Sequence, residues 1–147
     1  MEYFHKGTGI IKYDPYRGTM ASTPGWCIAD VDDQIADYYR HWLRVEKHIH
    51  LKPPSWGGHI SIVRGERVRP EVQHLWKKYH NQRTDFIYEH GVYHCAPDHK
   101  HGGLYYWINV ECPLFSEIRK ELMLPVGWHF HITVGRTYEY EARKPKG

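Results

Sequence analysis

Apolar and polar residues alternate along several stretches of the chain, and a period of two is typical of β-strands that bury one face. The clearest stretch is residues 130–136, where Phe130, Ile132 and Val134 are separated by polar or small residues. The pattern breaks at clusters of Gly, Pro, Ser and Asp, which favour turns and loops. Strands are therefore predicted at residues 7–13, around 26–31, at 59–64, at 84–89, at 104–111 and at 130–136.

Apolar residues spaced three and four apart predict helices between some of these strands. Asp32 is a suitable N-cap for a helix over about 33–48, because a carboxylate accepts hydrogen bonds from the first free N–H groups of a helix. Pro70 and Pro113 stand where the first turns of two further helices, to about 80 and about 122, are expected. The apolar stripe of the first helix comprises Ile35, Tyr38, Tyr39, Trp42, Leu43 and Val45.

The predicted elements form two comparable halves, each in the order strand, helix, strand. We expect the α+β class and one domain over residues 1–147, since this length is sufficient for one core of ordinary size. The halves are expected to form two antiparallel sheets around a central groove, with flanking helices, in a bilobal arrangement. The strands at 59–64 and 130–136 are expected side by side near a pseudo-twofold axis.

One short phrase occurs on two of the predicted strands. Residues 59–64 read His-Ile-Ser-Ile-Val-Arg, and residues 131–136, 72 positions later, read His-Ile-Thr-Val-Gly-Arg. Alternation places His59 with Ser61, and His131 with Thr133, on one face, while the isoleucines point to the core. The phrase therefore predicts a site that combines two imidazoles with two hydroxyls.

The residues that flank these histidines leave alternatives open. Alternation directs Arg64 and Arg136 away from the histidine face, where they would be exposed charges at strand ends. A β-bulge would redirect either of them, and Arg136 beside Gly135 is the better candidate for contact with substrate. His129 falls on the same face as His131, either as a ligand-binding residue or as a neighbour that lines the groove.

Two imidazoles placed across a phosphodiester can act as general base and general acid, because histidine titrates near neutral pH. The hydroxyls of Ser61 and Thr133 would donate hydrogen bonds to the non-bridging phosphate oxygens. This scheme requires no metal and no other cofactor. Which of His59 and His131 is the acid stays open at this stage.

Charge and aromatic content narrow the class of ligand. The formal net charge of +3 is compatible with an anionic small molecule but far below the positive field of a protein that binds duplex nucleic acid. Aromatic residues make up 15% of the chain, and exposed rings often stack on bases. For each ring, packing in the core is the alternative. The candidates for substrate stacking are Tyr13, Trp26, Trp56, Trp107 and Tyr138.

Three cysteines, Cys27, Cys95 and Cys112, are an odd number without metal-ligand spacing, which favours free thiols in a reducing compartment. The N-terminus has no apolar run of the kind found in signal peptides, and no stretch of 18 apolar residues occurs. We therefore expect a cytoplasmic protein that has no membrane partner.

The two His-x-[Ser/Thr] phrases resemble the hallmark motifs of the 2H phosphoesterase superfamily, which stand on strands of a bilobal α+β fold. Within it, the chain is similar to the phage enzymes that degrade cyclic oligonucleotide messengers of bacterial defence, the anti-CBASS phosphodiesterases. This closer similarity lies in residues 9–15 (Gly-Ile-Ile-Lys-Tyr-Asp-Pro), 54–56 (Pro-Ser-Trp) and 63–66 (Val-Arg-Gly-Glu).

The resemblance implies a metal-independent attack on the 3′,5′ linkages of cyclic di- and trinucleotides, in the cytoplasm of an infected bacterium. It assigns catalysis to His59 and His131, phosphate binding to Ser61 and Thr133, and the nucleophile to the adjacent 2′-hydroxyl. An alternative within the superfamily is an RNA-processing enzyme that opens 2′,3′-cyclic phosphates or handles 2′-5′ linkages. That enzyme would be favoured by a long basic groove, and the sequence has no sustained basic stripe.

Two alternatives lie outside this chemistry. One is a module that sequesters a nucleotide without cleaving it, which would not need paired histidines and hydroxyls. The other is a zinc or copper site in residues 90–101, where four histidines and a cysteine occur without a recognised ligand spacing.

Overall fold

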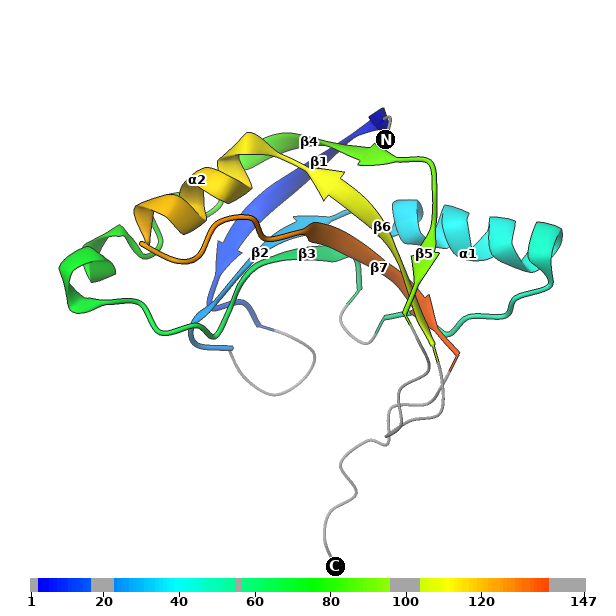
Figure 1. Cartoon of the computed structure of the whole chain (residues 1–147), viewed down its shortest axis with the longest axis horizontal. Coiled ribbons are helices and arrows are strands. Elements are labelled where there is room, and N and C mark those ends of the chain that lie inside the picture. Colours follow the sequence, from blue (N-terminus) through cyan, green and yellow to red (C-terminus); the bar gives the residue numbers. More distant parts are fainter. Residues whose placement is uncertain (1–2, 17–22, 55–56, 96–103, 138–147) are drawn as a thin grey trace, which may run out of the picture.

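The computed structural model describes residues 3–16, 23–54, 57–95 and 104–137 of the chain. Strands predominate in these residues, and helices are few and short (Figure 1). The strands are β1 (Tyr3–Tyr13), β2 (Trp26–Val31), β3 (His59–Arg64), β4 (Arg83–Glu89), β5 (Tyr93–His94), β6 (Tyr105–Glu111) and β7 (Phe130–Arg136); the helices are α1 (Asp33–Lys47), the 3₁₀ helix η1 (Pro70–Leu75) and α2 (Pro113–Glu121).

The strands pair in the order β4-β1-β2-β3-β7-β6-β5, and every pairing is antiparallel. β4 also pairs with β6, so six strands form a closed barrel and β5 is an extra strand on β6. The expected bilobal fold with two sheets around a groove is therefore wrong. The predicted halves share one sheet, because β3 pairs with β7 through Ile60 and Ile132 and β1 pairs with β4; the pairs Ile87–Glu111 and Tyr88–Val110 then close the barrel.

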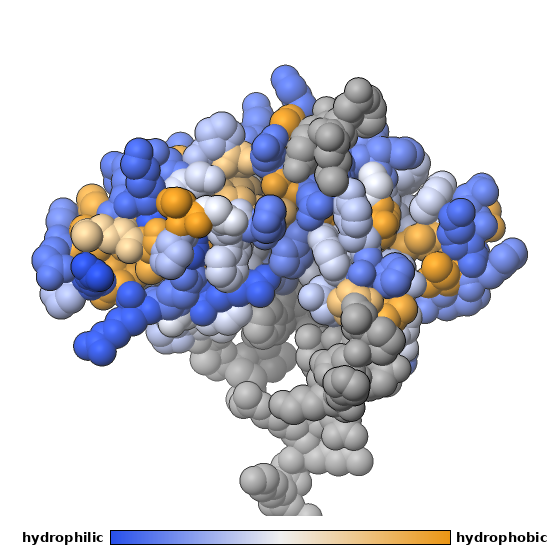
Figure 2. Space-filling model, viewed as in Figure 1, coloured by the Kyte–Doolittle hydropathy of each residue, from blue (hydrophilic) through white to orange (hydrophobic). Residues whose placement is uncertain are grey.

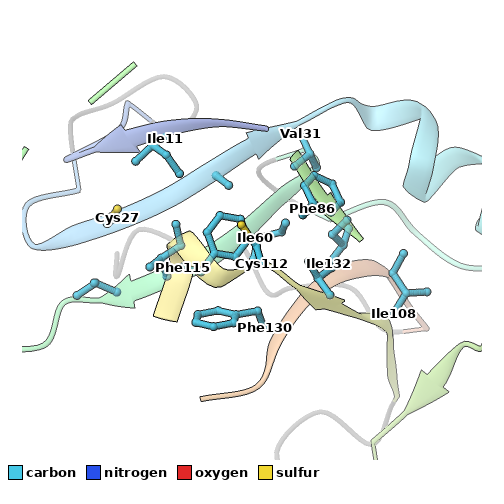
Figure 3. Close-up of a cluster of buried hydrophobic side chains, with 14 of the residues drawn as sticks. Ile11, Cys27, Val31, Ile60, Phe86, Ile108, Cys112, Phe115, Phe130 and Ile132 are labelled. Atoms are coloured by element: carbon cyan, nitrogen blue, oxygen red, sulfur yellow. The ribbon is translucent and has the colours of Figure 1, made fainter. Parts of the chain in front are cut away.

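One cluster of buried apolar side chains supports the barrel and both α-helices, and Figure 3 shows part of it. Ile11, Ile60, Ile108 and Ile132 come from four strands and are completely buried, as the alternating pattern predicts. Phe115 of α2 packs into the same cluster. Burial of one face of each strand leaves the opposite face for polar side chains, which is where the repeated phrase places its histidines.

Helix α1 begins as predicted, because the Asp32 carboxylate accepts a hydrogen bond from the Gln34 N–H at 2.9 Å. Its buried face is narrower than the predicted stripe, since Tyr38 and Val45 are 57% and 53% exposed. The predicted helix after Pro70 is a 3₁₀ helix that ends at Leu75, followed by turns with positive φ at two later residues, Lys77 and Asn81.

α1 and α2 lie at opposite ends of the molecule (Figure 1), and α1 contacts β7 while α2 contacts β3. Much of the viewed surface is hydrophilic, with apolar residues gathered mainly near the end that carries α2 and η1 (Figure 2). The three cysteines are free thiols. No helix in the part of the chain that the structure describes is long and apolar enough to span a membrane.

Candidate active site

The four side chains of the two phrases come together on neighbouring strands. Ile60 of β3 pairs with Ile132 of β7, and both are completely buried. In this antiparallel register Ser61 lies beside His131 and His59 lies beside Thr133, on the face opposite the core. The two histidines thus occupy diagonal corners of a quartet formed by His59, Ser61, His131 and Thr133.

A β-bulge in β3 adds Arg64 to this face. Cys27 pairs with Val63 and the next residue, Ile28, pairs with Ser61, so Ile62 is an extra residue in β3. The extra residue reverses the alternation, and the Nη2 of Arg64 lies 3.4 Å from the Nε2 of His131. Of the two alternatives for Arg64, the bulge is the one observed, whereas the sequence favoured Arg136 over Arg64 for the site.

β7 contains a matching bulge. Tyr106 pairs with Gly135 and Trp107 with Thr133, so Val134 is the extra residue. Arg136 is half-buried, and its Nη1 donates a hydrogen bond to the carbonyl of Pro53. In this structure its side chain holds the segment before β3, a role different from the predicted contact with substrate.

Replacing Gly135 by alanine is expected to disturb the β7 bulge. A Cβ at this position would stand 2.7 Å from the backbone oxygen of Lys52 and 2.9 Å from the Cβ of Leu51, and such overpacking lowers the free energy of unfolding by about 1–3 kcal/mol. Urea denaturation measures the loss. Gly91→Ala is the matched control, because its nearest neighbour would be at 3.8 Å; equal stabilities of the two variants would contradict the prediction.

Each histidine of the quartet is oriented by backbone two residues before it. The Nδ1 of His59 donates a hydrogen bond to the carbonyl of Gly57 at 3.1 Å. The ring of His131 makes a hydrogen bond with the backbone of His129, and its Nε2 faces Arg64. A carbonyl only accepts, so the Nδ1 of His59 carries a proton and the Nε2 of His59 is the nitrogen available for chemistry.

The surroundings of His131 favour its neutral form. Burial lowers the pKa of this imidazole below its ordinary value of 6.5, and the positive charge of Arg64 lowers it further; the hydrogen bond to His129 acts in the opposite direction. The neighbours on β6 are uncharged: Asn109 pairs with His131, and the Trp107 ring lies 6.2 Å from the imidazole. A neutral imidazole at neutral pH is suited to the role of general base.

The lowered pKa of His131 makes stability depend on pH. Below 6.5 the unfolded chain protonates this imidazole while the folded protein keeps it neutral, so the free energy of unfolding falls as the pH drops through 6.5 towards the lower pKa of the folded state. His131→Gln removes this contribution. We expect the loss of stability between about pH 7 and about pH 5 to be smaller in His131→Gln than in the wild type or in His74→Gln, an exposed control. Urea denaturation at both pH values measures it, and equal losses would contradict the prediction.

Among the predicted stacking residues that the structure describes, Trp107 pairs and packs directly beside the quartet. It pairs with Thr133, and two tyrosines flank its ring: Tyr93 stacks at 6.2 Å with an interplanar angle of 29°, and Tyr105 lies at 5.3 Å. Trp26 pairs with Arg64 across β2 and β3 and so stands at the margin of the site.

The other predicted side chains are placed differently. Tyr13 is 3% exposed and packs edge-on against Trp76 with ring centroids 4.9 Å apart. This ring therefore packs in the core and is not placed to stack on a substrate. The His129 side chain is exposed, and it is the backbone of this residue that contacts His131. Trp56 and Tyr138 lie outside the described residues.

A pocket of about 690 Å³ opens one strand away from the quartet. Its wall includes Ile28 and Asp30 of β2, which pair with Ser61 and His59 of β3. Lys12 and Lys77 contribute positive charge to the lining, Asp14 and Asp30 contribute negative charge, and the exposed ring of Tyr16 stands in it as well. The quartet therefore has a pocket of charged and aromatic side chains on the β2 side and the Trp107 rings on the β6 side.

Within the described ranges, no group of three or more His, Cys, Asp and Glu side chains is arranged to hold a metal ion. Residues 90–95 of the histidine-rich segment belong to these ranges, whereas residues 96–101 lie outside them. The metal alternative is thus tested only for the first half of that segment.

Comparison with protein-family models, with curated proteins and with solved structures finds no match to this chain. The quartet, its charges and the two flanking surfaces are the features of this chain that indicate a function.

Proposed function

We propose that the protein is a phosphodiesterase that uses His131 as general base and His59 as general acid. The observation that carries the proposal is the quartet itself: two imidazoles on neighbouring strands, each bonded to nearby backbone and each beside a hydroxyl. This arrangement supports the chemistry of the 2H phosphoesterases that the sequence resembles. The closed barrel differs from the fold which that resemblance implies, so the proposal depends on the site alone.

The reaction follows from the protonation states. The neutral Nε2 of His131 takes the proton of the 2′-hydroxyl, and the 2′-oxygen attacks the adjacent phosphorus. The bond from phosphorus to the 5′-oxygen breaks, and the protonated Nε2 of His59 gives its proton to that oxygen. The products are a 2′,3′-cyclic phosphate and a free 5′-hydroxyl. Ser61 and Thr133 donate to the non-bridging oxygens, on which negative charge develops.

Arg64 gives this site a permanent positive charge beside the neutral base His131. In the free protein its guanidinium lies beside the base nitrogen of His131, at a distance that is long for a hydrogen bond. A bound phosphate would attract the guanidinium and leave Nε2 free for the 2′-hydroxyl. The arginine would then stabilise the charge on the phosphate during the reaction.

The surfaces beside the quartet support a small cyclic oligonucleotide as substrate. One phosphodiester at the quartet would leave one base near the Trp107 rings and another near the pocket lined by Lys12 and Tyr16. A cyclic di- or trinucleotide presents bases on both sides of a linkage, which suits these two flanks. Degradation of cyclic messengers of bacterial defence, as the resemblance implies, is the biological role included in this proposal.

The test is incubation of the purified protein, in excess EDTA, with cyclic di- and trinucleotides and with a 2′,3′-cyclic mononucleotide, followed by mass spectrometry. Cleavage of the cyclic oligonucleotides that is lost in His59→Ala and retained in His74→Ala supports the proposal. Turnover of the 2′,3′-cyclic substrate alone identifies an RNA-processing enzyme instead. Binding without turnover identifies a sequestering module, and activity that disappears in EDTA identifies a metal enzyme.

A further inference from the structure

Arg119 of α2 is a charged side chain almost without solvent contact, at 1% exposure. Its two terminal nitrogens donate to the two carboxylate oxygens of Glu66, each at 2.7 Å, and its Nε donates to the carbonyl of Pro125 at 2.9 Å. Desolvation of a buried guanidinium costs free energy, so an apolar residue at this position would stabilise the packing of α2 at least as well. The contacts beyond the ion pair indicate what else this arginine does.

Those contacts converge on the bulge that carries Arg64. The Nη1 of Arg119 also donates to the carbonyl of Ile62, the extra residue of β3, at 2.9 Å. A carboxylate oxygen of Glu66 accepts from the backbone N–H of Arg64 at 3.4 Å. The ring of Trp128 contacts both guanidiniums, with its centroid 4.5 Å from that of Arg119 and 5.6 Å from that of Arg64. The network therefore contacts both the backbone and the side chain of the bulged segment.

The bulge of β7 is held in the same way from the other helix. Arg40 of α1 donates its Nη1 to the carbonyl of Val134, the extra residue of β7, at 2.7 Å, and its Nη2 pairs with Asp37. Ile62 and Val134 are the fourth residues of the two phrases. An arginine from a helix thus holds the fourth residue in both strands, which ties this contact to the bulges rather than to the packing of one helix.

We propose that Arg119, Glu66 and Trp128 form a positioning network that fixes the bulge of β3 and so holds the Arg64 guanidinium at the Nε2 of His131. The network contacts neither histidine and acts through Arg64. Its importance for catalysis rests on the proposed function, because that function makes His131 the base. Its structural claim, that Arg64 leaves His131 when the network is altered, is independent of any substrate.

The test measures the pKa of His131 by NMR titration in variants that keep the net charge. Arg119→Lys keeps the charge but cannot reproduce the paired contacts with Glu66 and Ile62, and Trp128→Leu removes the ring that contacts both guanidiniums. In both variants the pKa is expected to rise towards 6.5, in the direction of the rise in Arg64→Met. Glu121→Asp is the charge-conserving control on the same helix, because Glu121 pairs with Lys78 and Tyr79 away from the bulge.

A purely structural role for Arg119 predicts a different outcome, a loss of stability with an unchanged pKa for His131. The Arg64→Met background separates the two roles, since Arg119→Lys is expected to cause no further rise there. An unchanged pKa in the folded variants, or an equal rise in the Arg64→Met background, would overturn the proposal. If Arg119→Lys does not fold, Trp128→Leu carries the same comparison. A shifted pKa in a protein that cleaves no phosphodiester would leave the network standing and reject the function.

Discussion

Replacement of His131 by alanine is expected to lower turnover of a cyclic oligonucleotide by about 10²–10⁴-fold, the usual contribution of a positioned general base. His59→Ala should have a loss of similar size, because the leaving oxygen then departs without a proton. The double variant is expected to lose far less than the product of the two factors, since acid and base act in one step. Single-turnover rates measure all three, with circular dichroism to establish that the fold is kept.

The pH profile of kcat/KM gives the same prediction a second test. Its acid limb should report the base and lie below pH 6.5, because burial and Arg64 lower the pKa of His131. In Arg64→Met this limb should move to higher pH. A flat profile from about pH 5 to about pH 9, obtained with the chemical step limiting, would contradict a mechanism with two imidazoles.

The largest expected effect on stability follows from removal of the Glu66 carboxylate. In Glu66→Ala the Arg119 guanidinium keeps its charge at 1% exposure without an acidic partner, and a buried pair broken in this way typically costs about 3–5 kcal/mol. Urea denaturation followed by tryptophan fluorescence measures the loss. Glu71→Ala, at an exposed position of η1, is the matched control and should stay within about 0.5 kcal/mol of the wild type.

Replacing both partners gives a further comparison. Glu66→Ala combined with Arg119→Met leaves no charge in the buried position, so it should recover part of the stability lost in Glu66→Ala. If the single variant loses less than about 1 kcal/mol, the carboxylate of Glu66 is not what compensates the buried charge, and the basis of the prediction fails.

Local patterns in the sequence predicted the elements well. The strands 26–31 and 130–136 have the observed bounds, and Asp32 caps α1, because alternation and capping depend on neighbouring residues. The pairing of strands depends instead on contacts between distant residues. The pairing of β4 with β6 does not change the alternation of apolar and polar residues in either strand. For that reason the sequence led to two sheets where the structure has a closed barrel.

The quartet was predictable because its four residues need only alternation and the adjacency of β3 and β7. The position of Arg64 was not, because one extra residue at Ile62 reverses the alternation after it. The sequence did contain a sign of the bulges. Each phrase has an arginine at its sixth position, and simple alternation would turn that arginine away from the histidines. Arg119 gave no signal, since the carbonyl that it holds lies 57 residues earlier in the chain.

The seam between β3 and β7 is also the least hydrogen-bonded junction of the barrel, with one paired position against six between β6 and β7. That pair joins residues 72 positions apart, and such non-local contacts form late in folding because loop closure opposes them. An intermediate can thus contain both halves of the chain in near-native form while its histidines are still apart. For the same reason, a transient local opening of this seam in the native protein would separate acid from base without global unfolding.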